Sequence, residues 1–224
     1  MVQIMSHEAL CGASIAQLKK YCEQLREEIF QTVAVRGGHL ASNLGVVELT
    51  VGLHRVFEFP KDKIIFDVGH QCYVHKLLSG RAERFFTLRQ RGGIAGFPKR
   101  SESSYDSYDT GHAGTSVSAA LGIAKARDLK GEDFQVIALI GDGSLNNGLV
   151  YEALNSLKIL NTKVLIVLND NGMSISPTVG GTHEVLDEMK CGAASQEDIA
   201  LFERYGLKYM GIYNGNDLAE VIPA

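Results

Sequence analysis

The sequence lacks long apolar runs, and its longest hydrophobic stretches have only the length of a β-strand. A helix that crosses a bilayer needs about 20 consecutive apolar residues, so we expect no membrane partner. Residues 1–10 also lack the basic and apolar segments of a signal peptide, and the cysteines follow no disulfide spacing. These absences predict a cytoplasmic protein whose thiols stay reduced.

The sequence also lacks an excess of basic residues. Its 22 lysines and arginines face 26 acidic residues, which gives a net charge of −4. Such a balance leaves no basic footprint for nucleic acid, which we therefore do not expect as a partner. With 224 residues and 45% hydrophobic content, the chain is long and apolar enough to bury a full core.

Strand-like and helix-like segments alternate along the chain. Short runs of branched apolar residues predict buried strands at 64–68, 135–140 and 163–168, with a further strand at 208–212. Apolar residues spaced by three and four predict helices at 14–35, 45–57, 71–78, 83–90, 115–129, 145–160 and 196–205, and another from 217 onward. A short polar helix is possible between 181 and 191. This alternation predicts an α/β fold with a doubly wound, mostly parallel sheet and helices on both faces.

Two segments stand apart from this pattern. Residues 91–114 show little periodicity, and a loop of this length is usually functional or mobile. The helix at 45–57 is so apolar that we expect another domain or a second subunit to cover it. Left exposed, it would form an adhesive patch, which predicts dimerisation or poor solubility.

Polar residues stand at the predicted carboxyl ends of two neighbouring strands. Asp142 follows the strand at 135–140, and Asn171 follows the strand at 163–168. A right-handed crossover through the helix at 145–160 places both at one edge of a parallel sheet. Open α/β sheets bind their ligands at this edge.

The residue types at this edge suit a metal and a diphosphate. Oxygens of Asp142 and Asn171 are ligands of the kind that Mg²⁺ takes, with positions left for phosphate or water. Gly141 and Gly143 let a diphosphate approach the backbone, and a helix with Ser144 as its N-cap directs amide groups at it. Alternatively, Asp142 and Asn171 are only turn residues.

The sequence around these residues resembles that of one enzyme family. The resemblance extends over about residues 18–180 and rests on the motifs Gly37-Gly38-His39-Leu40-Ala41-Ser42, Asp67-Val68-Gly69-His70-Gln71, Gly111-His112-Ala113-Gly114-Thr115-Ser116, Gly141-Asp142-Gly143-Ser144 and Asn169-Asp170-Asn171-Gly172-Met173-Ser174-Ile175-Ser176. The last two resemble the thiamine diphosphate motif. Together, in this order, they resemble the 1-deoxy-D-xylulose-5-phosphate synthases, relatives of the transketolases.

The resemblance implies a fold, cofactors and site residues. The fold is that of the diphosphate-binding domain of thiamine diphosphate enzymes, and the cofactors are thiamine diphosphate and Mg²⁺. The metal ligands are Asp142, Asn171 and the backbone carbonyl of Met173. The resemblance implies that the cofactor contacts His70, Gly111, His112, Ala113, Gly143, Ser144 and Asn171. His39 and His70 are the implied catalytic residues that move protons near the substrate.

The implied reaction joins pyruvate to D-glyceraldehyde 3-phosphate with release of CO₂, for isoprenoid, thiamine and pyridoxal biosynthesis. The family activates its cofactor with a glutamate on a pyrimidine-binding domain. Residues 1–224 are expected to form a single diphosphate-binding domain, shortened near 181–200 and truncated at its C-terminal end. Neither the pyrimidine-binding domain nor the C-terminal transketolase domain is expected in this chain. Residues 214–217 also depart from the usual Asp-Gly-His-Asp.

These departures leave three interpretations. The chain is the N-terminal part of a synthase that works as a homodimer, or the N-terminal subunit of a split enzyme whose partner chain carries the pyrimidine-binding domain. The third is a non-catalytic module that binds the cofactor or a partner protein. We expect the chain alone to bind the diphosphate and Mg²⁺ without full turnover.

The histidines also have alternative interpretations. His39 follows two glycines and is either a solvated imidazole or a proton donor and acceptor. His70, Cys72 and His75 allow a zinc site, although no second ligand pair follows at a suitable spacing. His54 is expected at the surface.

Overall fold

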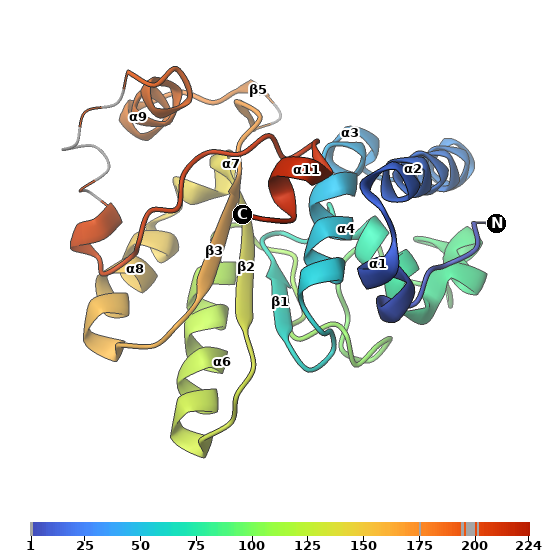
Figure 1. Cartoon of the computed structure of the whole chain (residues 1–224), viewed down its shortest axis with the longest axis horizontal. Coiled ribbons are helices and arrows are strands. Elements are labelled where there is room, and N and C mark those ends of the chain that lie inside the picture. The colour runs from blue at the N-terminus through green and yellow to red at the C-terminus, as the bar shows by residue number, and fades with distance from the viewer. Residues whose placement is uncertain (1, 175, 194, 196–199, 201) are drawn as a thin grey trace.

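The computed structural model describes residues 2–174, 176–193, 195, 200 and 202–224 (Figure 1). Its centre is a parallel sheet of three strands in the order β1-β2-β3. Their bounds are Lys63–Phe66, Val136–Gly141 and Leu165–Asn169. All three lie where apolar runs predict strands, and the crossover from β2 to β3 contains a short helix at Asp142–Leu145 before the longer one at Gly148–Leu160.

Side chains of the central strand alternate between two hydrophobic clusters. Ile137 and Leu139 of β2 pack in a cluster with α1, α2 and α4, whereas Ala138 and Ile140 pack in a second cluster with α6 and α8. Figure 1 shows these two groups of helices on opposite sides of the sheet. The doubly wound α/β arrangement is thereby confirmed.

The helices before β2 include one long helix and several short ones. They are α1 His7–Gly12, α2 Ile15–Arg36, α3 Leu40–Leu44, α4 Val47–Val56, α5 Tyr73–Lys76, the π-helical η1 Leu77–Arg81, the 3₁₀ segment η2 Ala82–Thr87 and α6 Ser116–Lys130. The helix predicted at 71–78 begins at Tyr73, and its helical backbone ends where Ser79 and Gly80 leave helical angles.

The elements after β2 are mostly short. They are α7 Asp142–Leu145, α8 Gly148–Leu160, the hairpin strands β4 Met173–Ser174 and β5 Ser176–Pro177, α9 Gly181–Lys190 and α11 Leu218–Val221. Within the part of the chain that the structure describes, no helix has the length and apolar character needed to cross a membrane.

The prediction that another domain or a second subunit covers the helix at 45–57 is wrong. Every residue of α4 from Val47 to His54 is buried, because α1, α2, α5 and α11 surround it. The same packing corrects the expectation for His54, which is only 5% exposed. The apolar character of α4 therefore reflects burial within this chain.

Other predictions after β2 need correction. Ser144 does not cap the long helix; it lies inside α7, and Asn147 occupies the N-cap position of α8. Residues 208–212 form no strand. Of the helix predicted at 196–205, residues 196–199 and 201 lie outside the described residues, while 200 and 202–204 are helical.

Candidate functional site

The predicted site residues gather where the three parallel strands end. Residue pairing aligns Gly141 with Asn169, so Asp142 and the turn that carries Asn171 leave the sheet side by side. Asp67 follows β1 at the same edge. Figure 1 shows α7 at this end of β2.

Asp67 fastens the loop before α6 to the end of β1. Its buried carboxylate accepts hydrogen bonds from the Gly114 N–H at 2.8 Å and the Ser116 N–H at 3.0 Å. Gly114 has a φ of +81°, and a Cβ there would lie 2.5 Å from Cβ of Asn147, so only glycine fits. The bonds leave the preceding residues Gly111, His112 and Ala113 exposed at the edge.

His70 is presented by a tight turn after Asp67. Val68 adopts a φ of +56°, which is strained for a β-branched residue. Gly69 follows with a φ of +89°, and a Cβ on it would lie 2.1 Å from Oγ1 of Thr110. Strain of this kind is retained at functional sites more than elsewhere.

The rings of His39 and His70, the two predicted catalytic residues, lie together. Their centroids are 5.1 Å apart with the rings edge to face, and the Phe97 ring lies 6.2 Å from His39. Burial lowers the pKa of His70, the nearby His39 lowers it further, and Asp67 opposes both effects. Burial and the positive charge of Arg89 lower the pKa of His39. Both imidazoles are therefore neutral at pH 7, able to accept or donate a proton.

On the metal side of the edge, the candidate ligands differ in how they are held. Asp142 is 3% exposed, and its Oδ2 accepts a hydrogen bond from the Thr178 hydroxyl at 2.7 Å. Asn171 is exposed, and its Oδ1 accepts the Met173 N–H at 3.0 Å. The Met173 side chain is also exposed. Gly143 and Ser144 are half-buried beside Asp142.

A metal at this edge would need other oxygen ligands beside a single carboxylate. Among the described residues, no group of three or more His, Cys, Asp or Glu is placed to hold a metal ion. Asp142 would supply one charged oxygen, and Asn171 and Met173 would supply neutral ones. A ligand phosphate would complete the coordination.

Several buried polar atoms beside the edge have no partner and fit a polar ligand. They belong to the segments at the end of β1 and before α6: His70 Nδ1, Gln71 Oε1, Thr110 Oγ1 and Ser116 Oγ. Each such atom costs about 1–3 kcal/mol when it stays unpaired. Hydroxyl donors suit phosphate oxygens, so the Thr110 and Ser116 hydroxyls are consistent with a diphosphate ester at this edge, whereas the Gln71 oxygen would accept from a donor group of a ligand.

The alternative zinc site does not form. Cys72 is fully buried and burial raises the pKa of its thiol to about 12, which disfavours the thiolate that zinc needs. His75 turns away into a buried row, with Nδ1 2.9 Å from Nε2 of His54 and Nε2 3.1 Å from Oδ1 of Asp106. Asp106 in turn accepts from Arg81.

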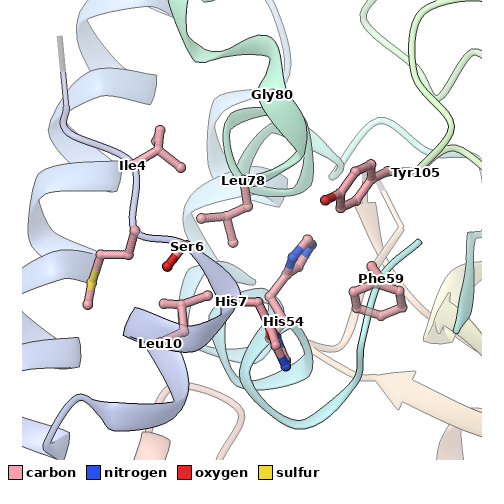
Figure 2. A pocket seen from close by; sticks show the side chains of 10 residues that line it. Ile4, Ser6, His7, Leu10, His54, Phe59, Leu78, Gly80 and Tyr105 are labelled. Atoms are coloured by element: carbon pink, nitrogen blue, oxygen red, sulfur yellow. The ribbon is translucent and has the colours of Figure 1, made fainter. Parts of the chain in front are cut away.

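A separate cavity lies away from the sheet edge. It has a volume of about 350 Å³ and is lined by apolar side chains with His7, His54 and Tyr105 (Figure 2). Figure 2 shows Tyr105 reaching in opposite Ile4 and Leu10. None of the predicted site residues lines this cavity, so we place the candidate functional site at the strand ends.

The fold matches those of solved transketolases. A transketolase variant from Pichia stipitis superposes with a TM-score of 0.73 at 20% identity, over 95% of this chain and 34% of that chain. The transketolase of the same organism in complex with sedoheptulose 7-phosphate gives a TM-score of 0.71 at 20% identity, over 92% and 33%. The chain therefore shares the α/β fold of about one third of these transketolase chains.

Sequence comparison defines the family. Residues 1–199 match the model of the N-terminal region of 1-deoxy-D-xylulose-5-phosphate synthase. The enzyme of that name from Dictyoglomus turgidum is 47% identical over 98% of this chain and 41% of its own length. That from Dehalococcoides mccartyi is 55% identical over 84% and 30%. The chain belongs to the 1-deoxy-D-xylulose-5-phosphate synthase family, and spans about two fifths or less of these relatives.

Proposed function

We propose that this chain is the diphosphate-binding part of a cytoplasmic 1-deoxy-D-xylulose-5-phosphate synthase. The whole enzyme would join pyruvate to D-glyceraldehyde 3-phosphate and release CO₂. One observation carries the proposal: the strand ends bring the His39 and His70 pair, the unpaired atoms beside it and Asp142 to one edge of the sheet.

In this proposal the residues divide the work. Asp142, the Asn171 side chain and the Met173 carbonyl would hold Mg²⁺, which would join the protein to the diphosphate. The loop that Asp67 fastens would line the diphosphate with Gly111, His112 and Ala113, and Gly143 and Ser144 would line it from the other side. Thiamine diphosphate, when bound, supplies the nucleophilic carbon that attacks the keto group of pyruvate.

His39 and His70 would exchange protons with the substrates. Both are neutral at pH 7, so each can take a proton from a hydroxyl group or return one as the product forms. Their edge-to-face arrangement lets them serve neighbouring oxygen atoms.

The proposal includes further domains. Residues 1–224 would form one diphosphate-binding domain, and the glutamate that activates the cofactor would come from a pyrimidine-binding domain. That domain would belong to the rest of the polypeptide, to a second copy in a homodimer or to a complementary chain. This chain covers 41% and 30% of the two relatives, which is consistent with further domains of this kind.

Calorimetric titration of thiamine diphosphate tests the site. We expect saturable binding with Mg²⁺, its loss in EDTA, and at least tenfold weaker binding by Asp142→Ala, which corresponds to about 1.4 kcal/mol. Asp133→Ala, an exposed aspartate away from the edge, is the matched control and should bind as the unaltered chain does. Binding that ignores both EDTA and Asp142→Ala would contradict the metal site.

Addition of a purified pyrimidine-binding domain in trans tests the reaction. Release of CO₂ from pyruvate that needs both chains and D-glyceraldehyde 3-phosphate would support the synthase. Cofactor binding without any turnover in the mixture would favour the non-catalytic module.

A further inference from the structure

Asn43 joins the two loops that carry the histidines. It lies in α3, is fully buried and therefore has no surface with which to contact a ligand. Its Nδ2 donates to the His39 carbonyl at 2.5 Å and to the His70 carbonyl at 2.8 Å. Its Oδ1 accepts the Tyr73 N–H at 2.9 Å. One side chain thereby links segments that precede α3 and follow β1.

The hydrogen-bond partners fix the orientation of this amide. Two carbonyl oxygens need donors and one N–H needs an acceptor, and only the side-chain amides of Asn and Gln can donate two hydrogen bonds while they accept a third. Both hydrogens of the amide nitrogen are used. A carboxylate would present oxygen to two carbonyl oxygens, and a leucine of similar shape would leave all three backbone groups without partners.

Tyr73 closes a ring of hydrogen bonds around the pair. Its hydroxyl accepts the His39 N–H at 3.4 Å, while its own N–H binds Asn43. The hydroxyl reaches this position because residue 38 is glycine: a Cβ there would lie 2.7 Å from Oη of Tyr73, and the φ of +147° disfavours other residues. His39 is thus held at its N–H and its carbonyl, and His70 at its carbonyl.

We propose that Asn43 is a positioning residue that sets the distance and angle between the His39 and His70 imidazoles. The backbone bonds hold the Cα atoms of the two histidines, so the rings meet edge to face without any direct bond between them. The importance of this geometry for catalysis rests on the proposed function, but the geometry itself does not.

Nuclear magnetic resonance of the histidine-labelled chain, without any ligand, tests the proposal. In the unaltered chain we expect a nuclear Overhauser contact between the two rings and a pKa of His70 below its usual value. Asn43→Ala should lose the contact and raise the pKa of His70, because the loops separate and the charge of His39 moves away. Signals are assigned with His39→Gln and His70→Gln.

Leu154→Ala is the matched control, since it removes core volume on the other face of the sheet. It should leave the contact and both titrations unchanged, which separates positioning from a general loss of stability. Retention of the contact and the titration in folded Asn43→Ala would overturn the proposal. If that variant does not fold, Asn43→Gln decides. It keeps the amide on a longer side chain and should weaken the contact at least twofold, and an undiminished contact would overturn the proposal.

Cofactor titration adds a functional measurement. We expect Asn43→Ala to raise the Kd for thiamine diphosphate with Mg²⁺ at least fivefold, and Leu154→Ala to change it less than twofold. Equal effects of the two variants would overturn a role in the site. If the unaltered chain binds no cofactor, the proposed function fails, while the ring measurements still decide the role of Asn43.

Discussion

Strands β1 and β3 flank the same central strand, yet their surroundings differ. Residues Ile64, Ile65 and Phe66 of β1 are at most 2% exposed, because helices cover both faces of that strand. All five residues of β3 are only half-buried. Parallel strands are usually buried on both sides, so the β3 end of the sheet is the less complete one.

The same difference divides the candidate site. The histidine side follows β1 and is held by the buried groups Asn43, Asp67 and Tyr73. The metal side follows β3, where Asn171 and Met173 are exposed on a short hairpin. Under the proposed function, the histidine geometry would exist before a ligand binds, whereas the ligand would complete the metal geometry.

The largest effect should come from breaking the β1 end at Asp106. Its carboxylate accepts hydrogen bonds from His75, from Arg81 and from the Lys99 N–H. Asp106→Ala removes the buried carboxylate nearest to Arg81 and leaves that guanidinium only the longer contact with Glu102 at 3.6 Å, which we expect to cost about 3–5 kcal/mol of unfolding free energy. Urea denaturation measures this cost. As a control, Glu83→Ala at an exposed position should hardly change the free energy of unfolding. A cost below about 1 kcal/mol would show that the row does not support β1.

Core truncation compares the strands directly. Leu139→Ala in β2 removes a fully buried side chain and should cost about 2–5 kcal/mol. Leu168→Ala in β3 removes a half-buried one and should cost less than half as much. Both values come from urea denaturation, and equal costs would mean that β3 is packed as firmly as β2.

Ligand binding should act mainly on the β3 end. With thiamine diphosphate and Mg²⁺ at 100 times the Kd, stabilisation reaches about 2.7 kcal/mol, or roughly 100-fold in protection from hydrogen exchange. We expect the amides of 170–178 to gain more protection than those of 64–76. Mass spectrometry of exchange resolves the two segments, and a uniform gain would contradict an incomplete metal side.

A fall in pH should lower the stability of the region around β1, by less than the effects described above. Burial lowers the pKa of His54 and of His75, so the unfolded chain takes up protons below about pH 6.5 while the folded chain does not. Unfolding is then favoured as pH falls, and stability is constant above that value. We expect Tm to fall by about 2–4 °C per kcal/mol lost between pH 7 and 5.5. His54→Gln should flatten the slope, and an unchanged slope would contradict this cause.

Local patterns were sufficient for the elements whose signals are complete within a few residues. Helix α2 has its apolar stripe, a capping box of Ser14 and Gln17, and Gly37 with positive φ at its end. The strands are runs of branched residues. In contrast, the pattern at residues 208–212 predicts a strand, but these residues form none, because no described strand pairs with them.

The sequence was sufficient to predict site residues that belong to a local motif, but not contacts that join segments far apart in the chain. Strand ends and motifs placed Asp142 and His70 at one edge. Asn43 was missed because its three bonds join residues far apart in sequence, and its position in a short helix gives no local signal. The role of Asp67 was also missed, although a carboxylate directly after a buried strand is a local signal that could have indicated it. The turn signal in Asn146-Asn147-Gly148 should have excluded Ser144 as the cap of α8.

The pairing of the strands also has a consequence for how the chain folds. β2 meets β3 through the short segment of α7 and α8, whereas β1 must find β2 across the entire segment from α5 to α6. Distant pairings form more slowly, because the chain between them loses more freedom when its ends meet. We expect pulse-labelled hydrogen exchange to protect β3 before β1. The three-strand edge would then be assembled last, so a nascent chain has no place for the cofactor until its folding is almost finished.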